Sequence, residues 1–241
     1  MVTTYILVHG GLHGSWCWQR AVGPLRDAGH VVDAVDLPGR DGTIGADLEA
    51  YERVVADAVD RAEPPVILVG HSLGGVTVSR CVESRPDAVA GLVLVNALLA
   101  EDGEAALSKL LTAGEECAFM QPGALDFSDD GSTVSVAPSF VVDGFYNCCS
   151  AADAEWASAQ LCAEPVAPLM VPLQITADGF GSVPKVYLGS RDDHVLPWWF
   201  QVKMSKAAGA QFVELQGDHS PFLSVPDDLV AYLLDIDLNG N

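Results

Sequence analysis

The sequence is poor in basic residues. Its 241 residues include only 12 lysines and arginines against 33 aspartates and glutamates, which gives a formal net charge of −21 at pH 7. Binding to nucleic acid or to an anionic membrane surface needs basic patches, so we expect neither partner. The acidic residues are spread along the chain, which is typical of a solvated surface.

The sequence also lacks an apolar run long enough to span a membrane. Residues 1–30 lack the basic and then apolar pattern of a secretory leader, so we expect a cytoplasmic protein. The six cysteines show neither C-x-x-C spacing nor the Cys/His spacing of metal sites. We therefore expect free thiols and no metal site at these residues. The sequence as a whole implies no metal or organic cofactor. Apolar residues make up 49% of the chain, which is enough for a sizeable core.

One stretch carries the strongest functional signal. Residues 65–69 are apolar and rich in β-branched side chains, which predicts a buried strand. Gly-His-Ser-Leu-Gly follows at 70–74 and fits G-x-S-x-G, and a helical segment covers 76–83. A strand, a tight turn and a helix are the context in which this motif presents a serine nucleophile. Because that context argues against an accidental match on a glycine-rich loop, we predict that Ser72 is the nucleophile.

A second glycine-rich turn follows an apolar strand near the start of the chain. Its sequence, His-Gly-Gly-Leu-His at residues 9–13, lets the backbone approach a substrate. We expect an oxyanion hole made by the backbone N–H of Gly11 and of Leu73, the residue after the nucleophile. His9 is interpreted as a histidine that packs the loop, while His13 is a candidate for lining the substrate pocket.

The pattern of the chain indicates one core with an insertion. Apolar strand-like runs alternate with helical segments, which predicts a parallel sheet covered on both faces. The core is expected at 1–96 and 183–241, with a lid at 97–182, where the alternation stops. Aromatic side chains of the lid are candidates for the substrate chamber, although some must form a small core of the lid. Those candidates are Phe119, Phe127, Phe145 and Trp156.

A serine nucleophile needs a base, and the base needs a carboxylate that fixes its tautomer. His219 follows the last predicted strand and is the best candidate for the base. His30 lies on a turn away from the strand ends, and His194 lies in the loop expected to hold the acid. Asp192 and Asp193 compete for the acid, and their spacing alone leaves the choice open. A cysteine nucleophile is the alternative, but no cysteine stands on a comparable turn.

These motifs together resemble the α/β-hydrolase superfamily over the whole chain. More narrowly, the sequence is similar to the hydroxynitrile lyase/plant methylesterase group and its bacterial esterase relatives. The resemblance rests on residues 7–18, 29–39, 68–75, 145–153 and 183–188. It implies an α/β-hydrolase fold, in which a mostly parallel central sheet carries helices on both faces and a lid insertion.

The resemblance also bears on the site residues. In that group the acid stands four residues before a proline, in the pattern D-x-x-[IL]-P. The pattern matches Asp193, Leu196 and Pro197, and therefore favours Asp193 over Asp192. The group's oxyanion hole falls on Gly11 and Leu73, in agreement with the motif analysis.

Two positions depart from the lyases of the group. These lyases carry a threonine after the first motif histidine and a lysine after the catalytic histidine, where this chain has Gly10 and Ser220. Without the lysine ammonium, no cation would stabilise departing cyanide. The methylesterases typically carry a methionine where Ser220 stands, so their small plant acids are not implied as substrates.

We therefore expect a serine carboxylesterase that cleaves small to medium apolar esters through an acyl-enzyme. A lactonase, a C–C hydrolase or a natural-product tailoring enzyme on the same triad is the main alternative. A hydroxynitrile lyase, or a ligand receptor without catalysis, fits the residues less well, because a receptor needs no nucleophile. The expected partner is a small-molecule ester, and a homodimer is left open.

Overall fold

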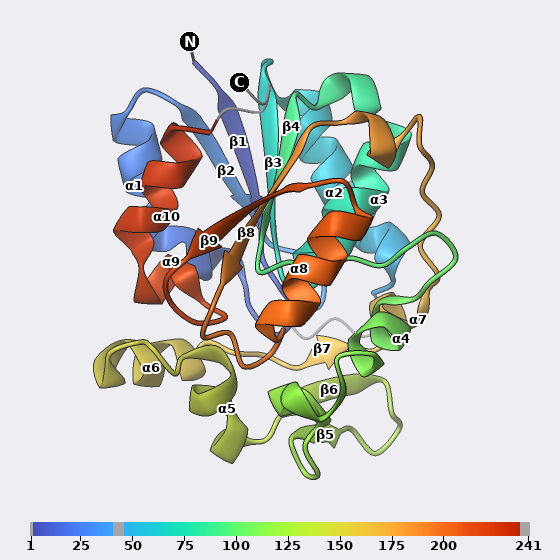
Figure 1. Ribbon diagram of the computed structural model, residues 1–241, viewed down its shortest axis with the longest axis vertical. Coiled ribbons are helices and arrows are strands. Elements are labelled where there is room, and N and C mark those ends of the chain that lie inside the picture. The colour runs from blue at the N-terminus through green and yellow to red at the C-terminus, as the bar shows by residue number, and fades with distance from the viewer. Residues whose placement is uncertain (1, 41–45, 237–241) are drawn as a thin grey trace.

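The computed structural model describes residues 2–40 and 46–236, so residues 1, 41–45 and 237–241 of the predicted core lie outside the described part. Its centre is a six-stranded sheet in the order β2-β1-β3-β4-β8-β9, in which every neighbouring pair is parallel (Figure 1). The strands are β1 (Thr4–Val8), β2 (Val31–Val35), β3 (Val66–His71), β4 (Gly91–Val95), β8 (Lys185–Ser190) and β9 (Gln211–Leu215).

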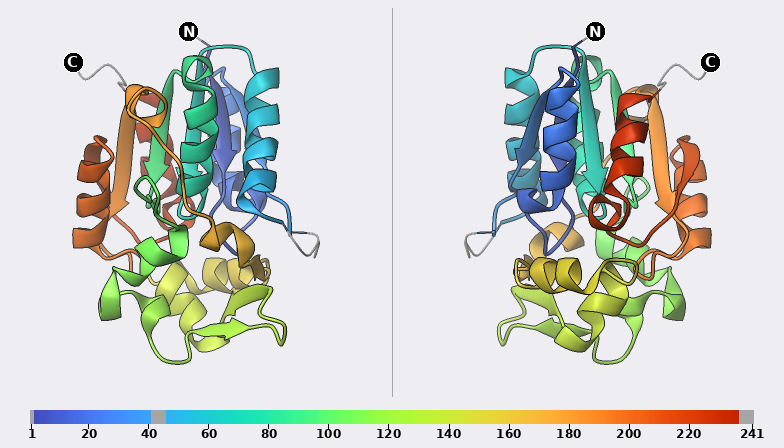
Figure 2. Two further views of the ribbon diagram at one scale, coloured as in Figure 1. Left: turned by 90° about the vertical axis from the view of Figure 1, so that its right-hand side faces the viewer. Right: turned by 90° about the vertical axis from the view of Figure 1, so that its left-hand side faces the viewer.

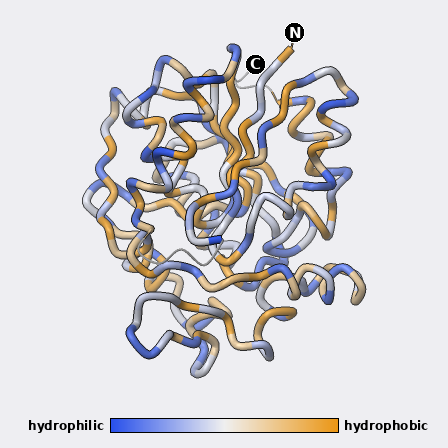
Figure 3. The backbone as a smooth tube through the Cα atoms, turned by 180° about the vertical axis from the view of Figure 1, so that it is seen from behind, coloured by the Kyte–Doolittle hydropathy of each residue, from blue (hydrophilic) through white to orange (hydrophobic). Residues whose placement is uncertain are grey.

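The sheet is the apolar centre of the molecule. All residues of the inner strands β1, β3, β4 and β8 are buried, because helices cover both faces of a parallel sheet. Figure 3 shows these strands as largely hydrophobic, while the hydrophilic positions lie mainly on the surrounding helices and loops. The predicted parallel sheet is confirmed.

Helices pack on both faces of the sheet (Figures 1 and 2). The helices α1, α9 and α10 lie on one face, whereas α2, α3 and α8 lie on the other. α2 begins where the carboxylate of Asp47 accepts a hydrogen bond from the Ala50 N–H at 2.8 Å, as a helix N-cap does. The bounds are α1 (Gln19–Asp27), α2 (Leu48–Arg61), α3 (Gly74–Ser84), α8 (Trp198–Ala207), α9 (Pro221–Ser224) and α10 (Pro226–Leu234).

The strand register brings the predicted site together. Val8 at the end of β1 pairs with Val35 and Gly70, and His71 at the end of β3 pairs with Val95. The strands therefore end at one level, and the loops that follow them meet at one edge of the sheet. Ligands of open α/β sheets bind at this edge.

Residues 97–182, here called the inserted segment, leave the sheet after β4 and return before β8. Most of this segment lies beneath the C-terminal edge of the strands (Figure 2). Its buried aromatic side chains, including Phe119 and Phe145, belong to the same hydrophobic cluster as the main sheet. Its elements are α4 (Ala106–Leu111), β5 (Leu125–Phe127), β6 (Thr133–Val136), α5 (Pro138–Phe145), α6 (Ala151–Ser158), β7 (Glu164–Pro165) and α7 (Ala167–Met170).

The inserted segment contains a small antiparallel sheet, β5-β6-β7, which the sequence analysis did not predict. Its strands have only 3, 4 and 2 residues, too few to show a clear alternation. Thr-Val-Ser-Val at 133–136 was the one available signal. This sheet matters for the site because it positions Glu164 of β7.

The last part of the inserted segment runs back along α3 to the start of β8 (Figure 1). The Glu83 carboxylate at the end of α3 accepts hydrogen bonds from the N–H groups of Thr176 at 2.8 Å and Phe180 at 2.9 Å. These contacts fix the return path to the core. Within residues 2–40 and 46–236, no helix combines the length and the apolar character that crossing a membrane requires.

Candidate active site

Ser72 lies on a strained turn between β3 and α3. Its φ of +49° is uncommon for a residue with a side chain, so the surrounding contacts must hold it there. The Ser72 carbonyl accepts the N–H groups of Gly75 and Leu98, both at 2.9 Å. A Cβ on Gly74 would lie 2.7 Å from the His9 carbonyl oxygen, so only glycine allows this approach. The turn therefore holds Ser72 at the C-terminal edge of the sheet.

His219 and Asp193 form a buried pair in the loops after β9 and β8. The His219 Nδ1 lies 2.8 Å from the Asp193 Oδ2, and both side chains are fully buried. The Asp193 Oδ1 accepts the N–H groups of Val195 and Leu196, both at 2.8 Å. A carboxylate at Nδ1 places the ring proton there and leaves Nε2 as the basic nitrogen.

The His219 Nε2 is buried and has no hydrogen-bond partner among the described residues. His71, next to the nucleophile, lies 2.8 Å through its Nε2 from the His219 carbonyl oxygen, and the two rings are 4.9 Å apart. The loop of His219 is thus fixed beside the turn of Ser72, although Ser72 and His219 share no hydrogen bond. Such bonds are often long before substrate binds and tighten afterwards.

Two supporting residues were underestimated by the sequence analysis. Asp218, next to His219 in the sequence, accepts the Ser220 N–H at 3.0 Å and the Cys148 N–H of the inserted segment at 2.8 Å, and nothing in the sequence indicated this second contact. Asn96 was not singled out, yet its side-chain N–H donates to the Asp218 carbonyl at 2.8 Å. Asn96 directly follows the apolar strand β4 and has a φ of +41°. A polar residue at the end of an apolar run was the sequence signal that could have indicated its role.

Gly11 and Leu73, predicted to supply the oxyanion hole, lie side by side. A Cβ on Gly11 would be 3.6 Å from the Leu73 side chain, and one on Gly10 would be 2.7 Å from the Ser72 Cβ. Both Gly11 and Leu73 line the cavity that Ser72 also lines. The two backbone segments therefore flank the place where a substrate carbonyl would meet Ser72.

The cavity at Ser72 is small and apolar, with a volume of about 100 Å³. Three of the predicted substrate contacts, Phe119, Phe127 and Phe145, line it. Glu164, which sequence analysis missed, is the one ionisable side chain among the described residues that line it. The remaining lining residues are Leu12, Leu98, Leu107, Leu110, Leu125, Val134, Val166, Leu169, Val195 and Leu196, beside Gly11, Ser72 and Leu73.

The other two predicted substrate contacts lie outside this cavity, which corrects the prediction for them. His13 is fully buried, and its Nε2 lies 3.0 Å from the Tyr146 hydroxyl oxygen. The imidazole thus serves a packed aromatic cluster. Trp156 packs edge-on against Trp16, with ring centroids 5.3 Å apart.

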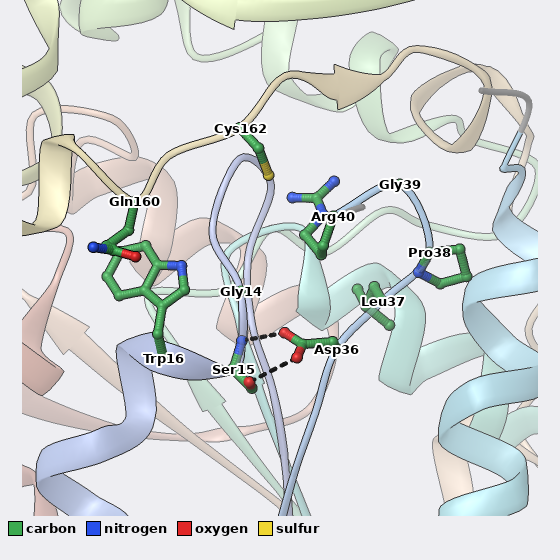
Figure 4. A pocket seen from close by; sticks show the side chains of 10 residues that line it. All are labelled: Gly14, Ser15, Trp16, Asp36, Leu37, Pro38, Gly39, Arg40, Gln160 and Cys162. Atoms are coloured by element: carbon green, nitrogen blue, oxygen red, sulfur yellow. Dashed lines mark hydrogen bonds between the residues drawn. The ribbon is translucent and has the colours of Figure 1, made fainter. Parts of the chain in front are cut away.

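A larger cavity of about 680 Å³ lies elsewhere, around Trp16, Asp36, Arg40 and Cys162 (Figure 4). Asp36 there accepts hydrogen bonds from the backbone N–H and the hydroxyl of Ser15 at 2.6 and 2.9 Å. Because this cavity contains none of the three predicted triad residues, we assign the candidate site to the smaller one. Among the described residues, no group of three or more His, Cys, Asp or Glu is placed to hold a metal ion.

A model of the alpha/beta hydrolase family matches residues 5–232. The chain belongs to the α/β-hydrolase family. The predicted fold class and family are therefore confirmed.

Curated relatives of this α/β hydrolase include plant proteins named as esterases and methylesterases. It is 31% identical to "Probable esterase PIR7A" of Oryza sativa subsp. indica, over 96% of this chain and 95% of that protein. It is 28% identical to "Putative methylesterase 11, chloroplastic" of Arabidopsis thaliana, over 96% of this chain. The chain spans only 63% of the length of that Arabidopsis protein.

Solved structures share the fold over almost the whole chain. A pyrethroid hydrolase from Sphingobium faniae JZ-2 is 29% identical, with a TM-score of 0.86 over 98% of this chain and 97% of that one. Polyneuridine aldehyde esterase has the same TM-score over 98% of this chain and 99% of that one. At 24% identity, that second likeness shows the fold alone.

Three neutral histidines are buried around the site of this α/β hydrolase. Burial lowers the pKa of His9 to about 4 and that of His13 to about 3, and it lowers the pKa of His71 well below its ordinary value. His9 packs the loop, as interpreted from the sequence, because its Nε2 accepts the Leu37 N–H at 3.0 Å.

We expect acid to unfold this α/β hydrolase between about pH 6.5 and 4. Because these folded-state pKa values lie below the unfolded value of about 6.5, unfolding takes up protons below that pH and stability falls. Each of His9 and His13 should cost about 2 kcal/mol at pH 5, against a typical total of about 5–15 kcal/mol. Urea unfolding at pH 7.5, 6 and 5 measures the loss.

The histidine variants provide the control for this acid effect. His9→Gln should make the loss of stability between pH 7.5 and 5 smaller by about 2 kcal/mol, because His13 and His71 remain, whereas the same change at exposed His194 should leave the loss unchanged. A free energy of unfolding that stays constant from pH 7.5 to 5 would contradict the assignment of buried neutral histidines.

Gly10→Ala should damage both the fold and the site. The added Cβ would lie 2.7 Å from both the Ser72 Cβ and the His71 Nδ1, and both neighbours are packed. We expect a loss of about 1–3 kcal/mol in stability and more than about tenfold in kcat/KM. In the matched control Gly23→Ala the new methyl meets no described atom within 4 Å, and the interior of helix α1 favours alanine over glycine, so stability should not fall and should rise by about 0.5–1 kcal/mol. Equal effects of the two variants would refute the close-packing argument.

Proposed function

We propose that this α/β hydrolase is a serine carboxylesterase. The observation that carries the proposal is the buried His219–Asp193 pair at the same sheet edge as the strained Ser72 turn, with a His219 Nε2 that no described residue hydrogen-bonds. His219 takes the Ser72 proton as the oxygen attacks the ester carbonyl, and then protonates the departing alkoxide. Water activated by His219 next cleaves the acyl-enzyme, which releases the acid and regenerates Ser72. The scheme requires no cofactor.

The oxyanion hole is proposed from two backbone N–H groups. Gly11 and Leu73 flank Ser72, and Leu73 stands at the N-terminus of α3, where N–H groups and the helix dipole favour negative charge. The developing charge of the tetrahedral intermediate would be held there. Each donor in such a hole contributes about 10²–10³ to kcat.

The proposed substrates are neutral esters with a short apolar group on at least one side. The cavity at Ser72 is lined almost entirely by leucine, valine and phenylalanine, and its volume of about 100 Å³ is well below that of a drug-sized pocket. This small volume favours a short acyl group over the larger substrates that a natural-product tailoring enzyme, one of the alternatives, would take. The names of the rice esterase and the pyrethroid hydrolase are consistent with ester cleavage.

Lyase chemistry is not favoured by the site. Gly10 has no room for the threonine side chain found in the lyases, since even a Cβ would meet Ser72. Ser220 is buried where those lyases carry a lysine, and no lysine or arginine lines the cavity among the described residues. Departing cyanide would therefore meet no cation.

We also propose that the inserted segment, residues 97–182, acts as the lid of the core formed by 1–96 and 183–241. It supplies most of the apolar cavity wall, including Phe119 and Phe145. A cytoplasmic location and a homodimer remain predictions.

A substrate panel tests the function. p-Nitrophenyl esters from acetate to dodecanoate, a set of lactones and mandelonitrile should show hydrolysis of the short esters, little turnover of dodecanoate and no cyanide release. A fluorophosphonate probe should label Ser72 covalently. A lactone turned over faster than every ester would favour the lactonase alternative, and an unreactive Ser72 would favour a ligand receptor.

A further inference from the structure

Glu164 places a buried carboxylate in the wall of the apolar cavity. It is 2% exposed and lies on β7 of the inserted segment. Its Oε2 accepts the Leu12 N–H and the Arg40 Nη2–H, both at 2.7 Å, and its Oε1 accepts the Tyr51 hydroxyl at 2.6 Å. A buried carboxylate is costly to desolvate, so one that is fully bonded at a reactive site calls for an explanation.

Glu164, Arg40 and Tyr51 form one largely buried polar cluster, and its contacts converge on the loop that carries Gly11. Arg40, paired to Glu164, also donates from Nη1 to the His13 carbonyl at 2.8 Å. The N–H of Cys162, two residues before Glu164, donates to the Leu12 carbonyl at 3.0 Å. Figure 4 shows Arg40 and Cys162 together at the edge of the larger cavity. The peptide group before Leu12 is therefore held by the Glu164 carboxylate, and the peptide group after Leu12 by the Cys162 N–H.

Leu12 needs such a hold, because its φ is +64°, a conformation that a leucine rarely adopts. Gly11, which precedes it, has no Cβ to restrict its own rotation. A Cβ built on Gly11 would be 3.6 Å from the Glu164 Oε2, so the carboxylate lies directly against the glycine. Without the bond to the Leu12 N–H, the loop could relax and turn the Gly11 N–H away from Ser72.

Arg40 explains how a negative charge is tolerated so close to the proposed oxyanion. Alone, the Glu164 carboxylate would oppose the charge that develops on the substrate oxygen. The guanidinium neutralises it through a buried charge-assisted bond. Tyr51, whose pKa is raised by burial and by the neighbouring Glu164, remains a hydroxyl donor.

We propose that Glu164, neutralised by Arg40, is a positioning residue that holds Leu12 in its strained conformation and thereby aims the Gly11 N–H into the oxyanion hole. The inference rests on the proposed function. This role gives the inserted segment a part in the chemistry. The carboxylate that bonds the Leu12 N–H comes from β7 and not from the six-stranded sheet.

The first test is Glu164→Gln and Glu164→Ala, assayed for kcat and KM with p-nitrophenyl acetate. Glu164→Ala should lower kcat by about 10–10²-fold with KM within threefold, because a misaimed oxyanion donor weakens transition-state binding. Glu164→Gln retains an oxygen acceptor and should recover most of the loss. A rise in KM alone would make Glu164 a cavity wall, and an unchanged kcat would overturn the inference.

Because breaking a buried ion pair can prevent folding, the second variant replaces both partners. Arg40→Met/Glu164→Leu leaves no unpaired charge, although the Tyr51 hydroxyl and the Leu12 N–H lose their acceptor, so it should fold with reduced stability. It should still lose about 10–10²-fold in kcat, which a purely structural pair would not. The matched control is Glu83→Gln, since Glu83 also accepts backbone N–H groups of the inserted segment but lies away from the site. That variant should lose stability and keep its kcat.

Fluorophosphonate labelling separates this inference from the proposed function. The reaction depends on Ser72 and the oxyanion hole and needs no ester turnover. Wild-type protein that is labelled but cleaves no ester would refute the esterase proposal while still allowing the hole to be tested. In the double variant the labelling rate should fall in step with kcat. An unchanged labelling rate would overturn the role of Glu164.

Discussion

Ser72→Ala should lower kcat for p-nitrophenyl acetate by about 10⁶-fold, the loss typical of removing the nucleophile from a working triad. Alanine keeps the Cβ, so the turn at φ +49° is strained to the same degree and the fold should remain. The loss is therefore chemical. It is measured by steady-state kinetics on protein whose thermal midpoint matches that of the wild type.

The matched control for this change is Ser108→Ala. Ser108 is an exposed serine on α4, so its loss should leave kcat/KM within about twofold. Labelling by the fluorophosphonate should vanish in Ser72→Ala and persist in Ser108→Ala. Ester hydrolysis that survives in Ser72→Ala above about 1% of wild type would disprove the proposed mechanism.

Asp193→Asn should lower kcat by about 10⁴-fold through the tautomer of His219. The carboxamide oxygen can still accept the N–H groups of Val195 and Leu196, which now bond to Oδ1. Its NH₂ group then faces the His219 Nδ1, which must become an acceptor. The ring proton moves to Nε2, and the base can no longer receive the proton of Ser72.

Asp192→Asn is the matched control, one residue away. Asp192 is exposed, and its recorded hydrogen bonds are made by its backbone, with Gly217 and Asn147. Its kcat should stay within about threefold of wild type. If Asp192→Asn lost activity while Asp193→Asn kept it, the acid would have been assigned to the wrong residue.

The sequence could predict the parts of the site that are encoded locally. Ser72 is the central residue of a five-residue motif, which lies between a strand and a helix that the local pattern predicts. His219 and Gly11 each follow a predicted strand, and parallel strands bring such loops to a common edge. The alternation of apolar and helical segments likewise predicted the sheet, whose inner strands are buried throughout.

The residue pattern alone could not decide which of two neighbouring residues takes a role in the site. Asp192 and Asp193 are chemically identical neighbours, and only the direction of each side chain separates them. The family resemblance favoured Asp193, and the structure places that carboxylate against His219. His13 and Trp156 show the opposite outcome, because the packing of neighbouring aromatic rings directs both away from the cavity.

By itself, the sequence determined which motifs follow which strands, the tight turn at the serine and the loops that meet at one edge of the sheet. Each of these depends on a short stretch of chain. Only the tertiary structure decided which groups far apart along the chain touch. Glu164 reaches a backbone N–H 152 residues away, across a small sheet whose strands are too short to leave a pattern. A contact of that kind depends on how the inserted segment packs on the core, and no local propensity records it.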